Sequence, residues 1–230
     1  METLELFKKK KKVLKEGAVP SGYIKHSQTG VLYPRVTSVT KVIDKPWLVQ
    51  FYLEHGEQEA ERRTDEAADI GTEAHQAIEV YIRSLGKTCS DKLPIGFLQF
   101  FKEEAIDLTQ PFLCEERLFS DELGVCGKPD LIAHTKYGIG VYDWKTSKDV
   151  YPDYAIQMAY YYQLARESGW NIHFGCVVKF PKPSEVLKKI PYTRIPSMVL
   201  DKVLLPVAKS CMSIFVWQKS FKMNKERLAI

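Results

Sequence analysis

The chain has 230 residues with 33 basic and 29 acidic side chains, a formal net charge of +4. This length suits one sizeable hydrophobic core, or one core with an added lobe, and the hydrophobic content of 45% is typical of a soluble globular protein. The sequence has no apolar run of about 18 residues that could span a membrane, and its N-terminus lacks an apolar signal segment. We therefore expect a cytoplasmic protein with no membrane partner. The charge balance neither requires nor excludes a nucleic acid partner.

The N-terminal part of the chain is predicted to be mainly helical. Its first residues include a lysine run, which is either a solvated tail or an arm that contacts phosphate. Residues 21–33 contain the glycines of a hairpin. Thr37 or Ser38 suits a helix N-cap, and Pro46 suits the first turn of the next helix. Further helical segments are predicted at 47–69, 70–85 and 93–108.

His75 lies on an apolar stripe of the second of these segments, together with Ile78, Ile82 and Leu85. A residue on such a stripe faces the protein rather than water. His75 is therefore either a hydrogen-bonded core residue or a ligand at a site.

Three consecutive strands are predicted between residues 114 and 145, separated by turns at Gly124 and Gly138. The first strand carries Glu115 and Glu116. Because side chains alternate along a strand, only one of the two glutamates can face a site on the sheet.

Two carboxylates and one ammonium group follow on the next two strands, at Asp130, Asp143 and Lys145. Asp143 and Lys145 are two residues apart and therefore point to the same face. The group either holds a divalent metal ion beside a phosphate or forms an ordinary salt bridge on a sheet face.

A helix is predicted from Pro152 to Ser168, in which Gln157 and Tyr161 are four residues apart and share a face. A strand pair and a long helix with a kink before Pro206 follow, at 172–180, 187–195 and 197–221. The five cysteines include no C-x-x-C pair, so their pattern predicts neither a zinc site nor a disulfide framework.

Three motifs occur in this order along the chain: G-K-P-D at 127–130, D-W-K-T at 143–146 and Q-M-A-Y-Y at 157–161. Together they resemble the G-x-x-D, D-x-K-T and Q-x-x-x-Y motifs of the PD-(D/E)xK nuclease superfamily, in its RecB-type exonuclease branch. Residues 33–48 are similar to an opening found in phage and bacterial relatives of the mitochondrial genome maintenance exonuclease. The resemblance extends over roughly residues 33–221.

The resemblance implies an α/β fold with a restriction-endonuclease-like core, a central mixed sheet flanked by helices, and a helical N-terminal lobe. It leads us to expect four segments: a basic N-terminal segment at 1–32, the helical lobe at 33–108, the nuclease core at 109–221 and a basic tail at 222–230.

The resemblance also implies a site for Mg²⁺ or Mn²⁺. His75, in a G-T-x-x-H match, would be a ligand, as would Asp130, Asp143 and the backbone carbonyl of Trp144. Glu115, which the match of E-x-x-L-F-S favours over its neighbour, would complete the site. No iron–sulfur cluster is expected, because only one cysteine lies near the C-terminus, where some relatives carry three.

Lys145 would either position and deprotonate a water molecule or stabilise charge on the phosphate. Gln157 would orient a ligand or hold the phosphate, and Tyr161 would brace its helix or contact DNA. Trp47 would hold bases, and Arg35 either binds phosphate or faces solvent.

These expectations predict a metal-dependent DNA exonuclease that prefers single strands with free ends, in a bacterial or phage-infected cell. It would serve DNA repair, recombination or replication. One alternative is a structure-specific or double-strand-end nuclease that uses the same site. The other is a non-catalytic DNA-binding accessory of recombination.

Overall fold

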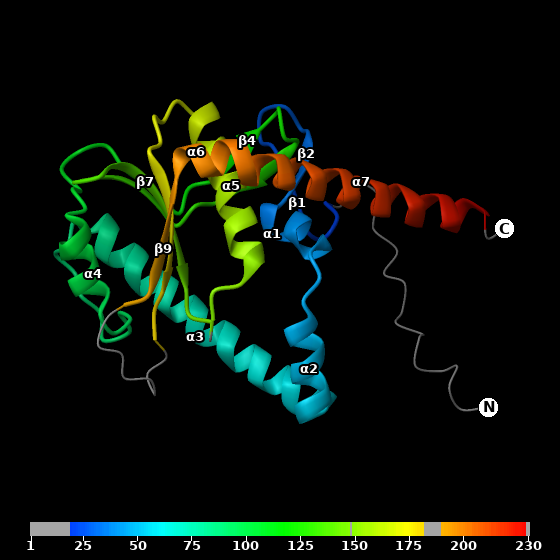
Figure 1. The fold of residues 1–230 in the computed structure, drawn as a ribbon, viewed down its shortest axis with the longest axis horizontal. Coiled ribbons are helices and arrows are strands. Elements are labelled where there is room, and N and C mark those ends of the chain that lie inside the picture. The colour runs from blue at the N-terminus through cyan, green and yellow to red at the C-terminus, as the bar shows by residue number, and fades with distance from the viewer. Residues whose placement is uncertain (1–18, 148, 182–189, 229–230) are drawn as a thin grey trace.

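A five-stranded mixed sheet lies at the centre of the computed structural model, which describes residues 19–147, 149–181 and 190–228, with side chains up to residue 221 (Figure 1). Its strands are, in spatial order, β3 (Leu113–Cys114), β6 (Leu131–Thr135), β7 (Gly138–Lys145), β8 (Phe174–Lys179) and β9 (Tyr192–Pro196). β7 and β8 run parallel, and the other neighbouring pairs run antiparallel. A parallel pair needs a crossover connection, which the helix between β7 and β8 supplies. The predicted central mixed sheet flanked by helices is confirmed.

The helices that cover the sheet are α3 (Glu57–Arg83), α4 (Phe97–Glu104), α5 (Pro152–Glu167) and α7 (Leu205–Leu228). On one face, Val141 belongs to a core with residues of α5 and α7. On the other face, Tyr142 and Trp144 belong to a core with residues of α3 and α4. Successive residues of β7 thus face opposite sides of the sheet, as expected for a strand, in which side chains repeat every two residues. Asp143 and Lys145 therefore lie on the α5 face, as the spacing predicted.

Aromatic rings fill the core on the α4 face and fix the end of β7. The Trp144 ring centroid lies 5.4 Å from that of Tyr142, 6.1 Å from that of Phe97 and 6.3 Å from that of Phe100. Edge-to-face and offset arrangements at these distances stabilise the packing beyond area burial alone. The main chain around residue 144 therefore rests on a rigid support.

The described chain begins with a hairpin of β1 (Tyr23–Lys25) and β2 (Leu32–Pro34), which confirms the predicted hairpin. The helix caps predicted at Thr37 or Ser38 are wrong. Helix α1 (Val36–Val39) begins earlier, with Arg35 at the N-cap and no side-chain capping bond. Burial of the two valines of α1 against the α5 face holds this short helix in place, and a 3₁₀ turn at Thr40–Val42 follows it.

A left-handed glycine separates the two long N-terminal helices. Helix α2 (Pro46–His55) begins with Pro46 in its first turn, as predicted, and ends at Gly56, whose φ is +75°. Glycine adopts this φ without steric cost, so α2 folds back against the start of α3 (Figure 1). The helix predicted at 93–108 is shorter than expected, since residues with left-handed φ bound α4 at each end.

The first predicted strand is not one element. β3 ends at Cys114, and Glu115 has a φ of +54°, which a strand cannot accommodate. The chain therefore leaves the central sheet, and β4 (Leu118–Ser120) pairs instead with β5 (Val125–Gly127). Asp130 likewise lies just before β6 rather than within it.

At the C-terminal end, β9 leads into α6 (Ser197–Val199), a π-helical turn at Leu200–Leu204 and then α7. The π turn lies directly before Pro206, where a kink was predicted, because proline lacks the N–H that continues the α-helical bonds. Within the described ranges, none of the helices combines the length and apolar character that a membrane span requires.

The predicted division at residues 108/109 stays a prediction. Helices α3 and α4, which precede it, share one hydrophobic core with β6, β7 and β8, which follow it. The lysine run of the N-terminal segment lies outside the described residues, as do the side chains of the predicted basic tail.

Candidate active site

Helix α3 makes a close approach to the end of β7. A methyl group at Gly71 would lie 3.2 Å from Thr146 Oγ1, so a glycine lets the helix pass here. His75 is one helical turn further along the same face. Its Nε2 lies 3.0 Å from the carbonyl oxygen of Trp144. The G-T-x-x-H pattern thus has a local reason, since the glycine permits the approach that the histidine uses.

His75 also meets two carboxylates. Its Nδ1 lies 3.1 Å from Asp130 Oδ1 and 3.6 Å from Glu115 Oε1. Asp130 Oδ2 accepts a hydrogen bond of 2.6 Å from the Trp144 N–H, which fixes the carboxylate. Potential ligand atoms of His75, Glu115 and Asp130 lie within 4.8 Å of one another. Glu116, the alternative to Glu115, is exposed.

The charges of this group compensate one another when no metal ion is bound. Both ring nitrogens of His75 face acceptor oxygens, so only the imidazolium form donates to both. Burial alone would lower the pKa of His75, but Asp130 and then Glu115 raise it to about 10. Burial raises the pKa of Asp130 to about 6, against the opposing effect of His75. Burial would also raise the pKa of Glu115, yet hydrogen bonds from His75 and Lys128 lower it to about 2.

A second polar network lies on the α5 face of β7. The Lys145 ammonium is 2.6 Å from Asp143 Oδ2 and 3.3 Å from Gln157 Oε1. Gln157 donates to Asp143 Oδ1 at 3.3 Å and to the Tyr161 hydroxyl at 2.8 Å. Burial would lower the pKa of Lys145, but the carboxylates of Asp143 and Asp130 raise it. The lysine is therefore held as a cation beside the first group.

The donor set fits a hard divalent cation. It offers carboxylate oxygens, a backbone carbonyl oxygen and one imidazole nitrogen, and such sets suit Mg²⁺ and, with the nitrogen, especially Mn²⁺. Asp143 Oδ2 is buried and is held by the Lys145 ammonium, 2.6 Å away. Asp143 lies outside the three converging side chains, so its place among the ligands stays a prediction.

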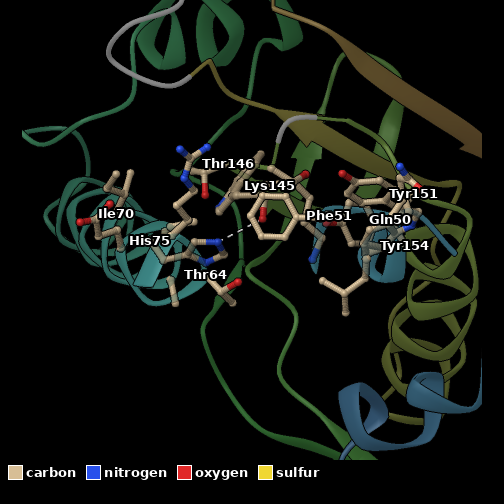
Figure 2. A pocket seen from close by; sticks show the side chains of 18 of the residues that line it. Gln50, Phe51, Thr64, Ile70, His75, Lys145, Thr146, Tyr151 and Tyr154 are labelled. Atoms are coloured by element: carbon tan, nitrogen blue, oxygen red, sulfur yellow. Dashed lines mark hydrogen bonds between the residues drawn. The ribbon is translucent and has the colours of Figure 1, made fainter. Parts of the chain in front are cut away.

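A cavity of about 820 Å³ opens over Lys145, between α2, α3 and the segment that follows β7. Figure 2 shows His75 on one side of it and Tyr151 and Tyr154 on the other, with Lys145 and Phe51 between them. Sequence reasoning gave no role to Phe51 or Tyr151. Their spacing in the sequence could not predict that they line one cavity, because they belong to separate elements.

A second cleft, of about 500 Å³, lies on the other side of His75. Glu115, Lys128 and Asp130 line it together with residues of α3. Lys128 forms an ion pair with Glu115. Lys128 was predicted only as part of the G-K-P-D motif. The sequence signal that could have indicated a role for Lys128 is its position two residues before Asp130, a predicted metal ligand.

The predicted substrate contacts lie in different surroundings. Trp47 stacks on Tyr151, with ring centroids 4.0 Å apart, in the wall of the larger cavity. Tyr161 is buried behind Gln157. Arg35 is exposed, its backbone bridges Cys126, and it lines neither of the two cavities. Its role in phosphate binding stays a prediction.

No protein-family model and no curated protein matches the chain. Among solved structures, SSO0001 is 14% identical with a TM-score of 0.44, over 85% of this chain and 78% of that one. The alkaline exonuclease LHK-Exo from Laribacter hongkongensis is 12% identical with a TM-score of 0.44, over 86% of this chain and 95% of that one. LHK-Exo in complex with dAMP gives 14% identity and a TM-score of 0.38, over 71% of this chain and 92% of that one. The function of this chain therefore has to follow from its own side chains.

Proposed function

We propose that the chain is a metal-dependent nuclease that hydrolyses phosphodiester bonds in DNA, as an exonuclease on single strands with free ends. One observation carries the proposal: two polar groups meet at the end of β7. The first is the cluster of His75, Glu115 and Asp130, and the second is the pair of Asp143 and Lys145. A cluster of potential ligands beside a lysine is the arrangement that phosphodiester hydrolysis needs.

A phosphodiester resists hydrolysis because its negative charge repels nucleophiles and its alkoxide is a poor leaving group. A bound Mg²⁺ or Mn²⁺ would supply Lewis-acid polarisation and a more acidic water. His75, through Nδ1, would hold this cation together with Glu115 and Asp130. The carbonyl oxygen of Trp144 faces the other ring nitrogen of His75, so its place among the ligands stays a prediction. The N–H of the same Trp144 orients the Asp130 carboxylate, which limits its motion before the cation binds.

Two roles are open to Lys145, that of a base toward water and that of a cation toward the phosphate. Its ammonium lies between oxygens of Asp143 and Gln157, a setting that favours the charged form. This supports the second role, in which the ammonium stabilises charge that develops on the phosphate. Gln157 positions the ammonium and is itself held by the hydroxyl of Tyr161.

The preference for free single-stranded ends rests on the position of the larger cavity. It lies between α2 and α3 on one side and the end of β7 with the start of α5 on the other. A flexible single strand enters such a space more easily than a duplex, which is wide and stiff. Contacts to its phosphates would make binding weaken steeply with salt.

The test uses an end-labelled linear single strand, the same strand closed into a circle, and a linear duplex, each with Mg²⁺, Mn²⁺ or EDTA. The proposal predicts metal-dependent degradation of the linear single strand alone. Equal cleavage of the circle would contradict the need for an end, and faster degradation of the duplex would indicate a double-strand-end nuclease. Binding without cleavage under every condition would indicate a non-catalytic accessory.

A further inference from the structure

We infer that the cavity over Lys145 is a nucleobase-binding site, in which Phe51 of α2 stacks on an unpaired base of the substrate strand. The inference rests on the proposed nuclease function and names the part of the nucleotide that this cavity takes. Its volume of about 820 Å³ is within the range of roughly 300–1,000 Å³ found for small-molecule sites.

Aromatic rings follow one another away from Lys145 along one wall of the cavity. The Lys145 ammonium lies 4.7 Å from the centroid of the Tyr154 ring, which is 5.6 Å from that of Tyr151. Tyr151 in turn stacks on Trp47 at 4.0 Å. These rings line an open cavity rather than a closed core. Planar aromatic surface in such a place suits a planar ring that can stack on it, and the base is the part of a nucleotide that has such a π-face.

Phe51 is the ring of this wall that is best placed to accept a base. Trp47 and Tyr151 cover one face of each other, and the Lys145 ammonium lies over the Tyr154 ring. The Phe51 ring meets His55 at 4.6 Å and Tyr52 edge-on at 6.2 Å, both on its own helix, so a base would stack on the face away from His55. Figure 2 shows the Phe51 side chain in the middle of the cavity.

The charges that line the cavity favour a base over a phosphate. Away from Lys145 and His75, the described residues of the lining carry the carboxylates of Glu54 and Glu66 and one cation, Arg63, which pairs with Glu59. A stretch of phosphates inside would meet two carboxylates, whereas a base carries no charge. The phosphate is better placed at the end of the cavity where Lys145 and His75 lie. Gln50, which also lines the cavity, donates to Glu54 Oε1 at 2.9 Å and keeps its amide oxygen and second N–H for base edges of any kind.

The wall that carries Phe51 is held in place before a substrate arrives. Lys45, at the start of α2, forms an ion pair of 2.5 Å with Asp153, which is largely buried at the start of α5. The stacked pair of Trp47 and Tyr151 adds a second link between the same two segments. A preorganised wall lowers the entropic cost of ordering a flexible strand. Stacking tolerates any sequence because every base has a π-face.

The test combines variants of the protein with abasic sites in the ligand. Binding of a labelled ten-nucleotide single strand is measured by fluorescence anisotropy in a buffer with Ca²⁺ instead of Mg²⁺. The base is removed from one position at a time. The variants are Phe51→Ala, Phe51→Trp, which keeps an aromatic ring, and Leu53→Ala as a control. Leu53 lies on α2, is 76% exposed and does not line this cavity.

We expect one position at which loss of the base weakens binding roughly tenfold to the unaltered chain and to Leu53→Ala. Phe51→Ala should bind the intact strand about tenfold more weakly than the unaltered chain does, and removal of that base should not weaken its binding further. In Phe51→Trp, removal of the base should still weaken binding. Equal binding of all abasic strands by the unaltered chain would overturn the inference. It would also be overturned if loss of the base weakened binding to Phe51→Ala as much as binding to the unaltered chain. Cleavage without any base dependence would refute this inference alone, whereas a chain that neither binds nor cleaves would refute the proposed nuclease as well.

Discussion

His75 and Asp130, which are 55 residues apart in the sequence, meet with 3.1 Å between Nδ1 and Oδ1. The main chain of Trp144 joins them, because its carbonyl oxygen faces His75 Nε2 and its N–H binds Asp130 Oδ2. Helix α3, the turn before β6 and the end of β7 must therefore all be folded before the site exists. Folding and metal binding are expected to be coupled.

Replacement of His75 by alanine should weaken Mn²⁺ binding at least tenfold. The variant loses the nitrogen ligand and leaves Asp130 and Glu115 without the cation that now lies between them. Isothermal titration calorimetry measures the change, and His134→Ala, at the far end of β6, is the matched control. An unchanged Mn²⁺ affinity in His75→Ala would show that the histidine has a structural role only.

The affinity for Mn²⁺ should rise with pH between pH 6 and pH 9. The folded metal-free form has a pKa of about 10 at His75, and a ligand histidine must be neutral, so binding has to displace a proton. Below this pKa the Mn²⁺ affinity should rise almost tenfold per pH unit, and each Mn²⁺ bound at pH 7.5 should release about one proton. Calorimetry in two buffers of different ionisation enthalpy counts the proton. A pH-independent affinity, with no proton released, would contradict the geometry at His75.

Replacement of Lys145 by methionine should lower the cleavage rate by about 10²–10³, the usual effect of removing one stabilising group from a reacting centre. Because Lys145 pairs with buried Asp143, the metal-free variant should also lose about 3 kcal/mol of stability. If Asp143 is a metal ligand, as the D-x-K motif predicts, Mn²⁺ should restore much of this loss by neutralising its carboxylate. Urea unfolding with and without Mn²⁺ measures both effects. A variant that cleaves at the normal rate would exclude Lys145 from the reaction.

Replacement of Lys128 by glutamine should have opposite effects on the binding of Mn²⁺ and on the binding of single-stranded DNA. Lys128 is the ion-pair partner of Glu115, so its loss frees a carboxylate and should raise Mn²⁺ affinity a few-fold. Binding of single-stranded DNA should weaken, and the slope of log affinity against log salt should become shallower by about 0.7. Lys92→Gln removes an equal charge outside both clefts and should change neither quantity. Weaker Mn²⁺ binding in Lys128→Gln would contradict this account.

Local patterns were sufficient to predict much of the fold. The two-residue spacing of Asp143 and Lys145 predicted their shared face, and so did the four-residue spacing of Gln157 and Tyr161, which form a hydrogen bond in the structure. These relationships lie within one strand or one helix, where backbone periodicity fixes the directions of side chains. The central mixed sheet flanked by helices was instead implied by the family resemblance, and the structure confirms it.

The predictions from the sequence were wrong where the backbone departs from regular helix or strand geometry. A non-glycine residue with a left-handed φ, Glu115, splits the first predicted strand between two sheets. Propensity gives no warning of such a residue, because tertiary contacts impose its conformation. For the same reason, the roles of Lys128 and Phe51 were not predicted. Their positions depend on how a turn and a separate helix pack at the end of β7.

The most direct test of the central claim is cleavage of an end-labelled linear single strand by the unaltered chain and by Asp130→Asn, each with Mn²⁺, Mg²⁺ or EDTA. Asparagine has the shape of aspartate but carries no charge, and its amide cannot replace the carboxylate beside His75. We expect cleavage by the unaltered chain with either metal, none in EDTA, and none by Asp130→Asn, whose binding of DNA should persist. Cleavage in EDTA, or undiminished cleavage by a folded Asp130→Asn variant, would contradict a metal centre at His75, Glu115 and Asp130.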